Sequence, residues 1–231
     1  MIPIRDDVAS RTIPFVTYGI IALNVLAFWY EIRLGHGSER FVEAFGLVPL
    51  RFHAMHDPIR RFTPVLTSMF LHGGLMHLLG NMLFLHIFGD NVEDRLGHRR
   101  FLLFYLACGT IAAFVQADIL PRSTVPMIGA SGAIAGVAGA YFVFYPRARV
   151  LVLVPLLLFY EILDVPAVVF LLLWFVMQIA FAVSGHGASP GAGVAWWAHL
   201  GGFAGGVLGA MVLGRGIERR SGTLTRPAVR R

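Results

Sequence analysis

A serine and a histidine in two apolar segments are the residues of this chain best suited to chemistry. Ser131 is flanked by small residues in Gly129-Ala130-Ser131-Gly132, at the start of a hydrophobic, Gly-rich stretch. His199 is the single histidine of a later apolar stretch, in Ala198-His199-Leu200-Gly201-Gly202. On two closely packed helices, an imidazole can accept the hydroxyl proton and so make the serine a nucleophile. The chemistry that this pair predicts is serine peptide hydrolysis inside a lipid bilayer.

A second polar pair suits the stabilisation of negative charge. His77 and Asn81 are four residues apart, so they share one face of a helix. Beside a serine nucleophile, their N–H groups can bind the oxyanion that forms when a peptide carbonyl is attacked. The backbone N–H of Ser131, near a helix N-terminus, is a third donor and adds the positive end of the helix dipole. The alternative for Asn81 is a structural hydrogen bond between helices.

These residues allow two other interpretations. Stripes of small residues let helices approach closely in lipid, so Ser131 and His199 could lie in an ordinary Gly-mediated interface. The histidines His72, His77 and His86 do not suit zinc, since His77 and His86 point to opposite faces of a helix. No acidic residue lies at matching depth in these segments, so a Ser-His dyad is expected rather than a triad, with no metal and no cofactor.

The composition is that of an integral membrane protein. Of 231 residues, 57% are hydrophobic and 14% are charged, against roughly 25% charged in soluble domains, and the mean hydropathy is +0.71. The net charge is +6 and every lysine-or-arginine position is arginine, a pattern better explained by membrane topology than by nucleic-acid binding. The single cysteine, Cys108, allows no intrachain disulfide and is expected to be buried in apolar packing.

The predicted fold is all-α, a polytopic bundle of six transmembrane helices over residues 13–214. The apolar runs are 13–30, 75–88, 101–120, 127–145, 165–183 and 194–213. Residues 150–160 are also apolar, but eleven residues are too few to cross about 30 Å as a helix, so we expect a partly buried connection there. Residues 1–12 form the N-terminus, residues 34–63 an interfacial first loop, and residues 215–231 a basic tail.

Arginine placement predicts the orientation. Arginines cluster after the second, fourth and sixth runs, at Arg95, Arg99, Arg100, Arg147, Arg149, Arg215, Arg219 and Arg220. By the positive-inside rule both termini then face the cytoplasm, although the arginines of the first loop depart mildly from it. With this topology His77, Ser131 and His199 all lie at a similar depth of ~5–10 Å below the outer ends of their helices.

Taken together, the motifs resemble those of the rhomboid family of intramembrane serine proteases, particularly its six-span bacterial members. Residues 67–81 contain the family's His-x-x-x-Asn, 129–132 its Gly-x-Ser-Gly, 198–206 its Ala-His-x-x-Gly-x-x-x-Gly, and 89–97 its Gly-x-x-x-Glu with Glu93. The motifs occur in the family's order, and the resemblance covers roughly residues 13–213.

The resemblance implies that Ser131 is the nucleophile and His199 the general base, with His77, Asn81 and the Ser131 N–H as the oxyanion hole. It implies substrates that are single-span membrane proteins, cut near the outer leaflet, and a location in the bacterial cell membrane. The alternative is an inactive rhomboid-like protein that binds or traffics membrane clients. A small transporter is disfavoured, because the chain shows no inverted repeat and no acidic residue at a span centre.

The chain departs from its relatives at two places. Some relatives have Tyr or Phe four residues after the nucleophile, stacked on the catalytic histidine, whereas this chain has Ala135. We therefore expect other packing, such as Trp196 or Trp197, to orient His199. Many relatives also have Trp-Arg in the first loop, where this chain reads Arg60-Arg61-Phe62.

Overall fold

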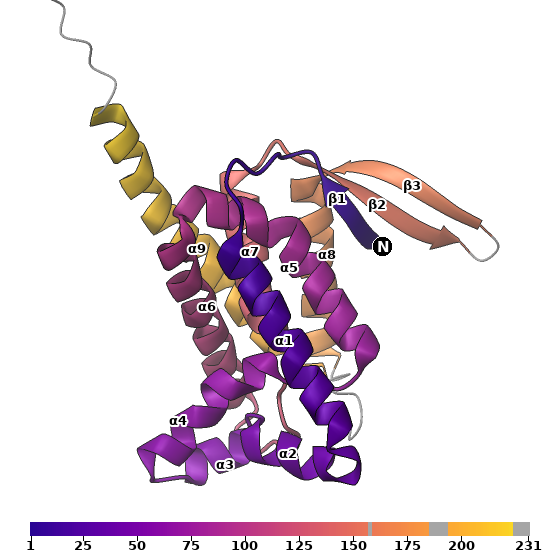
Figure 1. The fold of residues 1–231 in the computed structure, drawn as a ribbon, viewed down its shortest axis with the longest axis vertical. Helices are drawn as coiled ribbons and strands as arrows, with labels where there is room; N and C mark the ends of the chain where they lie inside the picture. The colour runs from indigo at the N-terminus through magenta and orange to yellow at the C-terminus, as the bar shows by residue number, and fades with distance from the viewer. Residues whose placement is uncertain (157–158, 185–193, 224–231) are drawn as a thin grey trace, which may run out of the picture.

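Helices account for most of the computed structural model, which describes residues 1–156, 159–184 and 194–223 (Figure 1). They are α1 (Phe15–Arg33), η1 (Gly35–Gly37), α2 (Ser38–Phe45), α3 (Pro49–Ala54), α4 (Pro58–Thr67), η2 (Ser68–Phe70), α5 (Leu75–Leu96), α6 (His98–Ile119), α7 (Ser131–Phe144), α8 (Ala167–Val183) and α9 (Trp196–Thr223). The expected helical membrane bundle is confirmed. Residues 224–231 of the expected tail lie outside the described residues.

The long apolar helices differ in how readily they would span a bilayer. Within the described residues, α1, α6 and the part of α9 up to Gly214 are long and apolar enough to do so. Helix α5 qualifies only together with α4 and η2, from which it is bent by 82°, and α7 and α8 are apolar but shorter. The count of six spans therefore stays a prediction.

The first loop forms short helices at one end of the bundle (Figure 1). The carboxylate of Asp57 accepts a hydrogen bond from the Arg60 backbone N–H at 2.9 Å and so caps α4. Arg61 lays its guanidinium over the ring of Phe52, 4.6 Å from the centroid. Leu47 pairs with Met127 through two backbone hydrogen bonds of 3.1 and 2.8 Å. The loop thereby holds the extended segment that leads into α7.

A three-stranded antiparallel sheet at the opposite end was not predicted (Figure 1). It consists of β1 (Ile2–Asp6), β2 (Arg149–Leu156) and β3 (Phe159–Pro166), in the order β1-β2-β3. The expected connection at 150–160 is thus a hairpin, and the N-terminal segment adds the third strand. The periodicity of a short apolar run does not show whether it is a strand or a buried connection. Here the pairing of β2 with β3 and β1 makes it a strand.

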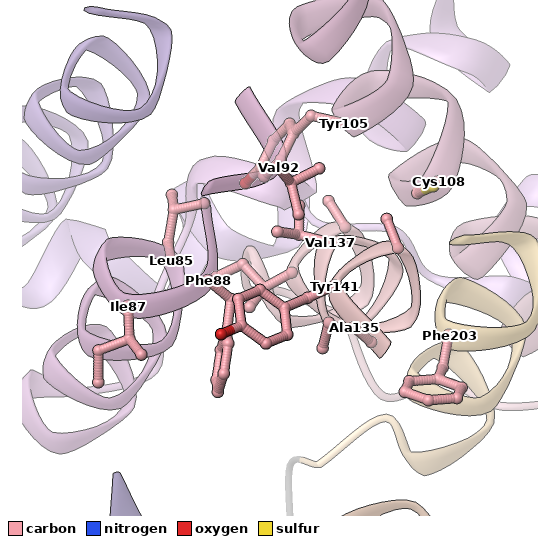
Figure 2. Packing of buried hydrophobic residues seen from close by; sticks show 14 of the residues in the cluster. Leu85, Ile87, Phe88, Val92, Tyr105, Cys108, Ala135, Val137, Tyr141 and Phe203 are labelled. Carbon is pink, nitrogen blue, oxygen red and sulfur yellow. The ribbon is translucent and has the colours of Figure 1, made fainter. Parts of the chain in front are cut away.

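Buried side chains from α5, α6 and α7 fill the centre of the bundle. Phe88 and Tyr141 meet edge to face at 4.9 Å, with Tyr105 and Cys108 buried nearby (Figure 2). Cys108 is buried, as predicted. Glu93 is fully buried, and its carboxylate accepts hydrogen bonds from the backbone N–H groups of Val16 and Thr17 and from the Thr17 hydroxyl, at the start of α1. These bonds tie α5 to α1.

Helices α7 and α9 pack backbone against backbone. A Cβ added at Gly202 would collide with the carbonyl oxygen of Gly132, and one at Gly206 with that of Gly136. The close approach expected from the small-residue stripes is therefore confirmed. This contact sets the distance between the helix that carries Ser131 and the helix that carries His199.

Candidate active site

Ser131 is the first residue of α7, four residues later than the helix start expected from the apolar run. Residues 127–130 are instead held in place by backbone hydrogen bonds, including one of 2.8 Å from the Gly129 N–H to the carbonyl of Ser68. Gly129 has φ = +119°, which a side chain would strain, and a Cβ there would lie 2.7 Å from the His77 ring. The turn therefore requires glycine on two counts and places Ser131 at a helix N-terminus.

His199 lies in the first turn of α9 and is 7% exposed. Its Nε2 is 2.7 Å from the hydroxyl oxygen of Ser131, and its Nδ1 is 2.7 Å from the side-chain oxygen of Gln178 in α8. An amide oxygen can only accept, so Nδ1 carries the proton and Nε2 presents its lone pair. The Ser131 hydroxyl consequently donates to His199, which is the polarity that a general base requires.

Two tryptophans enclose the imidazole in place of an aromatic residue at position 135. Trp174 lies 5.9 Å from the ring at 32°, and Trp196 lies 5.9 Å from it at 90°. The sequence had pointed to Trp196 or Trp197, but not to Trp174 or Gln178 of α8. Gln178 could have been singled out from the sequence, because burying a polar amide inside an apolar span costs free energy and such a group usually has a partner.

Asn81 and His77 lie in the first two turns of α5 and line the same cavity as Ser131. The Asn81 side-chain nitrogen is 3.0 Å from Nε2 of His72, to which it donates one of its two N–H groups. The His72 ring meets the His77 ring edge to face, with centroids 5.1 Å apart, and the His72 backbone N–H points at the buried carboxylate of Glu31 at 3.3 Å. His72 thus ties the loop before α5 to Glu31 of α1 through its backbone N–H, and its ring accepts a hydrogen bond from Asn81.

The four predicted residues surround a cavity of about 220 Å³. Its polar lining consists of His77, Asn81, Ser131 and His199, and the rest of its wall is largely apolar, contributed by Met76, Gly80, Phe84, Ile134, Ala135, Ala138, Trp174 and Val194. A hydroxyl, an imidazole that can accept its proton, and the polar side chains of His77 and Asn81 therefore line one space whose remaining wall suits an apolar group.

Comparison with known proteins matches a family model described as Rhomboid domain over residues 60–216. The chain is 40% identical over 131 residues to a Rhomboid protease GluP of Bacillus subtilis, covering 55% of the chain and 24% of that protein. It is 30% identical over 141 residues to the human presenilin-associated rhomboid-like protein, mitochondrial, covering 58% of the chain and 34% of that protein. The chain thus matches only about a quarter to a third of the length of these relatives.

Proposed function

This chain belongs to the rhomboid family, and on that premise we propose that it is an intramembrane serine endopeptidase. Its substrates are membrane-spanning proteins, Ser131 is the nucleophile, and His199 is the general base. The observation that carries the proposal is the hydrogen bond of 2.7 Å from the Ser131 hydroxyl to the unprotonated Nε2 of His199, in a cavity that is also lined by His77 and Asn81.

The reaction begins when a substrate carbonyl enters the cavity beside Ser131. The Ser131 oxygen attacks the carbonyl carbon while its proton passes to Nε2 of His199. Negative charge then develops on the carbonyl oxygen, and the second N–H of Asn81, the His77 ring and the backbone N–H of Ser131 stabilise it. The protonated His199 next gives its proton to the leaving amine, and water, activated by the same histidine, hydrolyses the acyl-enzyme. No cofactor takes part.

The position of the site supports cleavage near one membrane surface. Ser131, His77 and His199 all lie in the first turn of their helices, at the end of the bundle that carries α2, α3 and α4 (Figure 1). We propose that this end is the outer face, with both termini in the cytoplasm of a bacterial cell. A single-span substrate is then cut close to the outer leaflet.

The test is incubation of the purified protein, in proteoliposomes, with a panel of single-span substrates. Wild type should release discrete fragments, and Ser131→Ala should release none while unfolding at the same temperature, since alanine is well tolerated in a helix. Ser68→Ala, which removes the hydroxyl of a buried serine outside the cavity, serves as the matched control and should cleave normally. If wild type and Ser131→Ala both bind a client and neither cuts it, the protein is an inactive client-binding relative instead.

A further inference from the structure

We infer that Gln178 is a positioning residue, which holds the general base His199 in the tautomer that accepts the Ser131 proton. The inference rests on the proposed function. It assigns to a neutral amide in α8 the orienting role that an aspartate has in a Ser-His-Asp triad.

The geometry of the amide leaves it one orientation. Gln178 is 5% exposed, and its side-chain nitrogen donates to the carbonyl oxygen of Trp174 at 3.2 Å. Its oxygen must then face the other way, where Nδ1 of His199 lies 2.7 Å away. Since both hydrogen bonds exist only with this orientation, the amide cannot turn without losing both of them.

The orientation of the amide determines the proton position on the ring. With Nδ1 protonated toward Gln178, the lone pair of Nε2 points at Ser131. In the other tautomer Nε2 would carry the proton and could not accept one from the serine, and Nδ1 would face the amide oxygen with two lone pairs opposed. Gln178 therefore penalises the inactive tautomer and favours the active one.

A neutral acceptor also suits the surroundings. Among the described residues that line the cavity, the titratable side chains are His77 and His199, with no carboxylate among them. A buried carboxylate in a membrane helix costs considerable free energy unless it is paired. An amide orders the ring without burying a charge, so the resting site stays neutral.

Helix α8 thereby has two functions at the site. Trp174 lines the cavity and packs on the imidazole, and Gln178, one turn later, fixes the proton of that imidazole. A shift of α8 away from α9 would weaken both contacts together.

The experiment compares Gln178→Met with Gln178→Glu in the purified full chain. Methionine has a similar length but offers no strong acceptor, whereas glutamate keeps an acceptor oxygen near Nδ1. Asn24→Leu is the matched control, because Asn24 is another buried amide that donates to the carbonyl four residues before it, in α1. The readouts are kcat and KM for a single-span substrate, the rate at which a fluorophosphonate labels Ser131, and the ¹⁵N signals of His199.

Gln178→Met should lower kcat and the labelling rate by about 10–100-fold with little change in KM, as expected when one orienting hydrogen bond is lost. Its ¹⁵N spectrum should show mixed tautomers, whereas the wild type shows protonated Nδ1. Gln178→Glu should recover most of the labelling rate, and Asn24→Leu should change only the unfolding temperature. A Gln178→Met protein with wild-type kcat and an unmixed tautomer would overturn the inference. If wild type itself neither cleaves nor labels, the proposed function fails, and the tautomer spectrum alone decides the role of Gln178.

Discussion

A single methyl group at Gly206 should separate α9 from α7 and slow catalysis two turns away. A Cβ at this position would overlap the backbone oxygen, carbon and Cα of Gly136. Backbone atoms cannot rotate away as a side chain can, so the overlap is relieved only when the helices move apart. Gly206 is seven residues after His199, or about 10 Å along the helix, and touches no part of the cavity directly.

The size of the effect follows from the contact distances. The overlap lies well inside the 3.4 Å at which ordinary contact begins, so relieving it displaces α9 by a distance on the order of 1 Å. The hydrogen bond between Ser131 and His199, now 2.7 Å, would then exceed the roughly 3.5 Å at which it ceases to be one. A displacement of this size at a reacting group costs about 100-fold in rate. Overpacking of this kind also destabilises a fold by about 1–3 kcal/mol.

Gly205→Ala is the matched control, with the same chemical change on the adjacent residue. Its Cβ would meet the flexible end of the Ile111 side chain at 3.1 Å, which can adjust. The assays are cleavage of a single-span substrate and fluorophosphonate labelling of Ser131, each at a temperature where both variants remain folded. Gly206→Ala should be about 100-fold slower than Gly205→Ala in both assays. Equal rates for the two variants would refute the claim that this backbone contact positions the site.

The remaining predictions concern the site and the sheet. Asn81→Ala should lower kcat by about 10–10³-fold, because it removes one oxyanion donor of several; a normal kcat would remove Asn81 from the site. Ser131→Ala/His199→Ala should cleave no more slowly than either single variant, since the two residues act as a unit, and additive losses would contradict the dyad. Burial raises the pKa of the Asp6 carboxyl above its ordinary value of 3.8, an effect partly offset by the hydrogen bond from Tyr141. The Asp6 carboxyl thus binds its proton more tightly in the folded state than in the unfolded state, so wild type should lose thermal stability relative to Asp6→Asn as the pH rises through the raised pKa. If the stability of the two proteins changes in parallel with pH, Asp6 does not make this contribution.

Much of the site could be predicted from the sequence because polar residues are conspicuous in apolar segments. A histidine, an asparagine or a serine inside a membrane helix costs free energy unless it has a partner or a function, so few candidates had to be weighed. His77, Asn81, Ser131 and His199 were selected on that basis, and the structure brings all four to one cavity. The glycines at four-residue spacing likewise indicated which faces of α7 and α9 would meet.

Other features depended on partners that are distant in the sequence. Residues 150–160 belong to a hairpin of β2 and β3, and β1, nearly 150 residues earlier, pairs with β2 as the third strand of the sheet. The start of α7 moved to Ser131 because Leu47 and Ser68 supply hydrogen bonds to the segment before it. Neither pairing leaves a trace in the local pattern of apolar and polar residues.

The sequence by itself therefore determined the class of the fold, the faces on which its helices pack and the chemical groups of the site. Only the tertiary structure decided that Gln178 faces Nδ1 of His199 and that His72 faces Asn81. The physical reason is that hydropathy and helical period act over neighbouring residues. The rotation and tilt of each helix, on which a hydrogen bond of 2.7 Å depends, are set by the packing of all the helices at once.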